Sequence, residues 1–129
     1  MDTIGDFLTR IRNAGMAKHE SLDIVSSKLR EGIAQVLHQS GYIRGFKVAK
    51  NKTRQLMRVY LRYNDSGDHI ISKVKRVSKP GCRVYVKQDN IPEIRSGYGI
   101  VVMSTNKGVM NGKIAKQESV GGEVLCQVW

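Results

Sequence analysis

The sequence predicts an α+β protein made of two small α/β lobes that pack together. Hydrophobic residues recur at helical spacing through most of the first forty positions, and from about Tyr42 they recur at every second position. A dense cluster of turn-forming residues, Asn64-Asp65-Ser66-Gly67-Asp68, follows at the middle of the 129-residue chain. We therefore expect an N-terminal lobe at residues 1–64, built as helix, strand, helix and hairpin, and a C-terminal, mainly β lobe with a short helix at residues 65–129.

Two helices and a short strand are expected in the first forty residues. The first helix covers about residues 1–15, and the strand follows at residues 22–25. Ser26-Ser27 offers hydroxyl groups that can cap the second helix, and Gly41 is suited to end it in a left-handed conformation. The apolar residues that give the two helices a buried face are Ile4, Phe7, Leu8 and Ile11, and then Leu29, Ile33, Val36 and Leu37.

Strands dominate the rest of the expected fold. A hairpin at residues 42–63 turns at Lys50-Asn51-Lys52, since apolar residues alternate with polar ones on both sides of it. Pro80-Gly81 suits a tight turn in which Gly81 takes a positive φ. Asn111 is expected to cap a short helix that ends near Gln117, although Gly112 in its first turn costs about 1 kcal/mol relative to alanine. Further strands are expected at residues 70–77, 82–87, 99–104 and 122–128.

The charge of the chain points to a polyanionic partner. Lys and Arg total 22 against 11 Asp and Glu, for a formal net charge of +11. Nucleic acid is the leading candidate, while an anionic membrane, an acidic protein, or a protein that is merely basic are the alternatives. Two basic stretches contain no acidic residue: Arg44, Lys47, Lys50, Lys52, Arg54, Arg58 and Arg62, and then Lys73, Lys75, Arg76, Lys79, Arg83 and Lys87.

The expected strand at residues 82–87 has one face that suits RNA. Strand alternation places Arg83, Tyr85 and Lys87 on this face, and Cys82, Val84 and Val86 on the other. An aromatic ring between two cations can stack on an exposed base while the cations meet phosphate. The alternative is an ordinary solvated strand face.

A polar loop, Met103-Ser104-Thr105-Asn106-Lys107-Gly108-Val109-Met110, leaves an apolar strand and leads towards Asn111. Its hydroxyl and amide groups suit the shallow minor groove of an RNA helix, which displays 2′-hydroxyls and base edges. Lys107 can contact phosphate, and Gly108 permits close approach. Taken alone, such a segment is also typical of a plain turn.

Catalytic, metal and cofactor sites are not expected. The three histidines, His19, His38 and His69, are scattered, and none lies near a candidate nucleophile or a second metal ligand. Gly97-Tyr98-Gly99 lacks the third glycine of a dinucleotide loop and precedes a strand. The candidate carboxylate pairs, Asp65 with Asp68 and Asp89 with Glu93, lie in turn-like sequence.

A cytoplasmic protein without a membrane segment is expected. Cys82 and Cys126 form no cluster, which favours a reducing compartment over a disulfide scaffold. The longest uncharged run, residues 96–106, is far shorter than the ~20 apolar residues of a membrane helix. The first residues already show a helical pattern that contains Asp2 and Asp6, so we expect no signal or transit peptide.

Several separated motifs follow one another over nearly the whole chain. They are Asp6-Phe7-Leu8-Thr9-Arg10-Ile11-Arg12-Asn13, Ser26-Ser27-Lys28, Arg76-Val77-Ser78-Lys79-Pro80-Gly81, Ser104-Thr105-Asn106-Lys107-Gly108-Val109-Met110 and Gly121-Gly122-Glu123. In this order they resemble the motifs of small-subunit ribosomal protein eight of the bacterial and organellar type. Asn106 and Asn111-Gly112-Lys113 depart from the family pattern, where a second hydroxyl residue and a Thr-Asp-basic helix start are common.

The resemblance implies a structural protein that binds the central domain of small-subunit ribosomal RNA early in assembly, beside other small-subunit proteins, in the cytoplasm or in a plastid. Repression of its own messenger RNA, a role of some family members, is a further candidate role. The core contacts implied are Ser104, Thr105, Lys107 and Gly108, with Asn106 at the altered position, Glu123 nearby, Arg83, Tyr85 and Lys87 in support, and Lys50 and Lys52 in the basic hairpin.

A DNA-binding architectural or regulatory protein is the alternative from another class, because charge and basic strands also suit DNA. Recognition of 2′-hydroxyls predicts a strong preference for RNA over its DNA counterpart. A hydrolase is a distant third, and it would be indicated by turnover that survives high salt but is lost when one carboxylate is removed.

Overall fold

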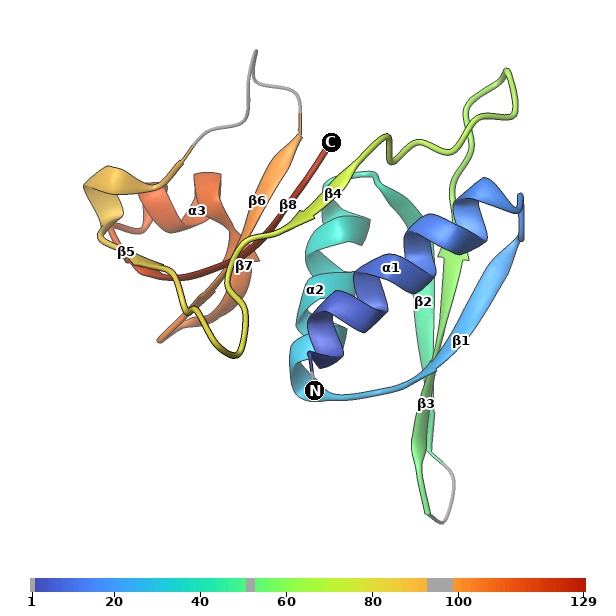
Figure 1. Ribbon diagram of the computed structural model, residues 1–129, viewed down its shortest axis with the longest axis horizontal. Coiled ribbons are helices and arrows are strands. Elements are labelled where there is room, and N and C mark those ends of the chain that lie inside the picture. The colour runs from blue at the N-terminus through green and yellow to red at the C-terminus, as the bar shows by residue number, and fades with distance from the viewer. Residues whose placement is uncertain (1, 51–52, 93–98) are drawn as a thin grey trace.

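The computed structural model describes residues 2–50, 53–92 and 99–129. Within these ranges the chain forms three α-helices, eight strands in two sheets and a short 3-10 helix (Figure 1). The predicted α+β class is confirmed. The elements are α1 (Thr3–Met16), β1 (Ser21–Val25), α2 (Lys28–Gln39), β2 (Ile43–Lys50), β3 (Gln55–Leu61), β4 (Val74–Arg76), β5 (Tyr85–Val86), η1 (Gln88–Asn90), β6 (Ile100–Thr105), β7 (Gly108–Asn111), α3 (Gly112–Gln117) and β8 (Gly122–Val128).

The helix ends follow local capping chemistry. Ser27 caps α2 as predicted, since its Oγ accepts a hydrogen bond from the Arg30 amide at 3.2 Å. Gly41, after the end of α2, has the expected positive φ of 81°. The cap of α1 was not predicted: the Asp2 carboxylate accepts from the Gly5 amide at 3.1 Å.

The first sheet has the strand order β1-β3-β2 and contains the predicted hairpin. Ile43 pairs with Leu61 and Phe46 with Val59, so the apolar residues of the two hairpin strands face one another. The three-residue step from Ile43 to Phe46 breaks the alternation because a β-bulge lies between Ile43 and Gly45.

The second sheet has the order β4-β8-β6-β7, with β5 also paired to β8. The strands predicted at residues 70–77 and 82–87 are much shorter, because β4 and β5 lie one after the other along the same edge of β8. The turn between them, residues 79–82, is closed by backbone hydrogen bonds in both directions between Lys79 and Cys82. Gly81 does not have the predicted positive φ, which fits a type I turn, where the third residue keeps a negative φ.

The predicted short helix, α3, is confirmed. The Asn111 Oδ1 atom caps it by accepting from the Lys113 amide at 2.9 Å. Gly112 is buried in the first turn, and a Cβ there would lie 3.1 Å from an Ile91 methyl group and 3.3 Å from Val101 Cβ. Close packing on β6 therefore explains a glycine that is unfavourable for the helix itself.

Helices α1 and α2 lie between the two sheets (Figure 1), where α1 contacts β4 and α2 contacts β7. The main hydrophobic core runs through this layer and joins Phe7 and Leu37 to Leu125 and Val128 of β8. A smaller core, which includes Ala115, lies under α3. The two lobes thus share a core, and their division at residue 64 stays a prediction.

Candidate nucleic-acid interface

The predicted polar loop is a tight hairpin turn between β6 and β7. Thr105 pairs with Gly108, and both belong to strands, so the extra strand β7 begins where a loop was expected. The Thr105 hydroxyl donates to the Gly108 carbonyl at 2.9 Å and accepts from the Lys107 amide at 3.1 Å. Asn106 and Lys107 are exposed at the tip. The sequence missed β7 because four residues show too little periodicity to separate a strand from a turn.

Gly108 has a φ of 114°, a conformation that favours glycine. A Cβ at this position would have no atom within 4 Å, so the space beside the turn is open. Gly108 therefore serves the backbone shape of the turn and leaves room for a ligand to approach.

Strand pairing brings three predicted contact residues into one row. Glu123 of β8 pairs with Tyr85 of β5 on one side and with Ser104 of β6 on the other. Paired residues in neighbouring antiparallel strands point to the same face of a sheet. Tyr85 is 68% exposed, which leaves its ring available at the edge of this row.

Two glycines before Glu123 allow this row to form. A Cβ at Gly122 would lie 2.2 Å from the Ser104 carbonyl oxygen, and one at Gly121 would lie 2.4 Å from the Val86 carbonyl oxygen. Because both neighbours are backbone atoms, any side chain would push β8 away from β6 or β5. In the sequence, these glycines are marked only by their place in the Gly121-Gly122-Glu123 motif.

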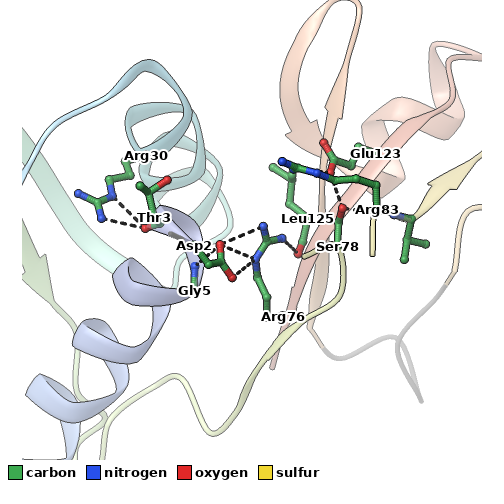
Figure 2. A network of polar contacts seen from close by, with 10 residues as sticks. Asp2, Thr3, Gly5, Arg30, Arg76, Ser78, Arg83, Glu123 and Leu125 are labelled. Atoms are coloured by element: carbon green, nitrogen blue, oxygen red, sulfur yellow. Dashed lines mark hydrogen bonds and ion pairs between the residues drawn. The ribbon is translucent and has the colours of Figure 1, made fainter. Parts of the chain in front are cut away.

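The Glu123 carboxylate is held by protein groups (Figure 2). Arg83 Nη1 donates to Glu123 Oε2 at 3.0 Å, and the Ser78 hydroxyl donates to the same oxygen. The Ser78 oxygen also accepts from the Val84 amide at 3.2 Å. Ser78 is fully buried and was not predicted as a site residue; its only sequence signal was its place in the Arg76–Gly81 motif.

The predicted alternation in residues 82–87 is largely confirmed. Arg83, Tyr85 and Lys87 are exposed, while Val84 and Val86 are half-buried against the smaller core. Cys82 was expected on the buried side and is exposed, because it belongs to the turn and only Tyr85–Val86 form the strand. Arg83 contributes less free charge than predicted, since it pairs with Glu123.

The remaining basic residues lie elsewhere. Lys50 is exposed at the end of β2, in the first sheet, whereas Ser104 and its neighbours belong to the second sheet (Figure 1). Lys52 lies outside the described residues. The predicted site therefore falls into a compact group around the β6–β7 turn and a separate basic hairpin.

The basic stretches contain no acidic residue in sequence, yet acidic residues meet them in space. Arg58 Nε lies 2.7 Å from Asp23 Oδ1, its cross-strand neighbour in β1. Arg76 forms an ion pair with Asp2, with 3.1 Å between Arg76 Nε and Asp2 Oδ2. Part of the positive charge is thus neutralised locally, which a linear count of charges could not reveal.

Two other features are absent from the part of the chain that the structure describes: metal-ligand clusters and membrane-spanning helices. There, no group of three or more His, Cys, Asp or Glu side chains is placed to hold a metal ion, and no helix is long and apolar enough to cross a membrane. Gly97-Tyr98 and Glu93 lie outside the described residues.

Comparison with known proteins identifies the family. A family model described as ribosomal protein S8 matches residues 2–129. The chain is 56% identical over 129 residues to the small ribosomal subunit protein uS8 of Bdellovibrio bacteriovorus, with 100% of both chains covered. It is 50% identical over 128 residues to the proteins of the same name from Geotalea daltonii and Geotalea uraniireducens, with 99% of this chain and 97% of each relative covered.

The chain belongs to the ribosomal protein S8 family. The resemblance read from the separated motifs is thereby confirmed. The S8 family consists of structural proteins of the ribosome and is not a class of enzymes. The relatives named above are bacterial proteins of the small ribosomal subunit.

Proposed function

We propose that this protein is a structural constituent of the small ribosomal subunit that binds ribosomal RNA directly, with the β6–β7 turn at the centre of the contact. The observation that carries this proposal is the ordered Ser104–Gly108 turn, which exposes Asn106 and Lys107 beside the row of Tyr85, Glu123 and Ser104. The names of its relatives support the ribosomal assignment.

The turn suits the minor groove of an RNA helix. The two hydrogen bonds of Thr105 fix the backbone that carries Asn106 and Lys107, so the turn itself has little backbone entropy left to lose on binding. Asn106 can donate and accept towards 2′-hydroxyls and base edges, and Lys107 can contact phosphate. The open space beside Gly108 allows the RNA backbone to come close.

The basic hairpin supplies a less specific part of the affinity. Lys50 is exposed at the end of β2. Lys50 and Lys52 are proposed to contact phosphate groups and so to add affinity that depends on salt but not on RNA sequence.

Finer features of the function rest on the family resemblance. We propose that the RNA site lies in the central domain of the small-subunit ribosomal RNA, that binding occurs early in assembly, and that the protein works in the cytoplasm or in a plastid beside other small-subunit proteins. Repression of its own messenger RNA, a role of some family members, is proposed as a further role.

The main test compares specific with random RNA. Thr105→Ala removes the two bonds that order the turn, and Lys107→Ala removes its charge, so each is expected to weaken binding to a central-domain RNA fragment by about tenfold or more. Binding to random RNA of equal length should change much less. Filter binding at fixed salt measures both affinities.

The matched control is Lys50→Ala with Lys52→Ala. This pair should weaken specific and random RNA alike and flatten the salt dependence. Equal losses on both RNAs for the turn variants would refute the specific assignment. Two further checks are a strong preference for an RNA hairpin over its DNA counterpart, and co-sedimentation with small ribosomal subunits after a high-salt wash.

A further inference from the structure

A single buried hydroxyl group joins two parts of the proposed RNA site. Ser78 is fully buried, and its oxygen makes two hydrogen bonds: it donates to the Glu123 carboxylate and accepts from the Val84 amide. Glu123 lies in the row beside Ser104, and Val84 immediately precedes the exposed Tyr85. Figure 2 shows Ser78 beside Glu123. The same hydroxyl therefore restrains a carboxylate on β8 and the backbone next to the aromatic residue of β5.

The two contacts leave one carboxylate oxygen available. Ser78 and Arg83 both bond to Oε2 of Glu123, and among the described residues Oε1 has no hydrogen-bond partner. The Glu123 side chain is only 15% exposed, whereas that of Arg83 is 46% exposed. The carboxylate is thus held in one orientation by a buried group and neutralised by a cation on its outer side.

A carboxylate is unfavourable on a surface that binds RNA, because its negative charge repels phosphate. Arg83 offsets this repulsion, and a fixed, acceptor-only oxygen can accept a hydrogen bond from an RNA donor, either a 2′-hydroxyl or a base amino group. This works only if the orientation of Glu123 is maintained, and within the described residues Ser78 is the buried group that maintains it.

We propose that Ser78 is a positioning residue of the RNA site: it orients Glu123 so that Oε1 accepts a hydrogen bond from a donor group of the RNA, and it holds the strand that presents Tyr85. This inference rests on the proposed function and adds a residue to it. Ser78 itself touches no RNA, since it is fully buried.

A double-mutant cycle separates positioning from a merely structural role. Ser78→Ala is expected to weaken binding to the central-domain RNA fragment by about tenfold while random RNA is bound almost as before. Glu123→Ala should cause a similar specific loss. If Ser78 acts through Glu123, adding Ser78→Ala to Glu123→Ala should lower the affinity for the central-domain fragment little further. The additional loss should be at most about threefold, and it would come from the weaker hold on the strand that carries Tyr85.

Two further variants keep the test decisive. Ser26→Ala is the matched control, because the Ser26 hydroxyl is also buried but has no hydrogen-bond partner within the described part of the chain; it should leave both affinities unchanged. Should Ser78→Ala unfold, Ser78→Cys retains similar volume and a weaker donor, and it should give a smaller specific loss. Thermal unfolding of each variant shows which one is folded.

The outcomes distinguish this inference from the proposed function. The inference is overturned if Ser78→Ala lowers the affinity for the specific RNA by the same factor in the wild type and in Glu123→Ala. It is also overturned if Ser78→Ala leaves that affinity unchanged. It is also overturned if Glu123→Ala leaves specific binding unchanged while Thr105→Ala and Lys107→Ala weaken it, and in that case the proposed function stands. If the turn variants show no specific loss, both proposals fail.

Discussion

One cysteine is buried and the other is exposed, although no motif in the sequence distinguishes the two. Cys126, in β8, is fully buried in the main core, and burial raises the pKa of its thiol to about 12, with Arg76 nearby opposing the rise. Cys82 is exposed in the turn that precedes β5. The thiolate is the reactive form of cysteine. Burial should therefore lower the reactivity of Cys126 for two reasons: a reagent cannot reach the thiol, and the raised pKa leaves little of it as thiolate.

We predict that the folded protein has one reactive thiol. A chromogenic disulfide reagent at pH 8 should titrate Cys82 rapidly and Cys126 only after denaturation. Cys82→Ser should abolish the rapid phase. Equal rates for both thiols in the folded protein would contradict the buried position of Cys126.

At the scale of single elements, β8 decides how the second sheet forms. It pairs with β6 on one edge and with β5 and then β4 on the other, and Gly122 lets it approach the Ser104 carbonyl closely. Strand periodicity predicted the bounds of β8 well, but it overestimated the lengths of β4 and β5. Their lengths depend on which part of β8 each one meets, and that is a non-local property.

We predict that Gly122→Ala destabilises the protein by about 1–3 kcal/mol and also weakens specific RNA binding, because the new Cβ would displace the strand that carries Ser104. Gly81→Ala is the control. Gly81 has no atom within 4 Å of its Cβ position and no positive φ, so its substitution should change stability by less than about 0.5 kcal/mol. Urea unfolding of both variants measures the difference.

At the scale of the whole molecule, a polar link joins the two lobes beside the shared core. The Asp2 carboxylate caps α1 and accepts hydrogen bonds from Arg76 of β4, whose Nη1 also donates to the Leu125 carbonyl at 2.6 Å (Figure 2). The buried Arg30 ties the start of α1 to β1, because its guanidinium donates to the carbonyl oxygens of Thr3 and Val25. The amino-terminal end of α1 is therefore anchored on both sides.

The Asp2 link should make stability depend on pH. Burial opposes ionisation of Asp2, but the hydrogen bonds from Arg76 and Gly5 outweigh it, so its pKa is below the ordinary value of 3.8. A carboxyl group with a lowered pKa in the folded state contributes stability that is present above its unfolded pKa. This contribution is lost as the pH falls through the folded pKa.

We predict that Asp2→Asn lowers the free energy of unfolding by about 1–2 kcal/mol at neutral pH, and that the difference from the wild type shrinks as the pH falls below about 4. Asp23→Asn is the comparison, because the Asp23–Arg58 pair is exposed and screened by solvent, so its loss should change the free energy of unfolding much less than the loss of Asp2 does. Denaturant unfolding between pH 7 and pH 2 measures both. A constant difference across that range would argue against the link.

The sequence by itself determined what depends on neighbours along the chain. Helical spacing predicted α1 and α2, and Ser27 predicted the start of α2. Alternation of apolar residues predicted the hairpin and β8, Asn111 predicted α3, and the motifs in their order indicated the family. The tertiary structure alone decided which distant groups meet: Glu123 with Ser78 and Arg83, and Asp2 with Arg76. The members of these pairs are 40 to 74 residues apart in the sequence. Their formation depends on strand register and on the shared core, which no local pattern encodes.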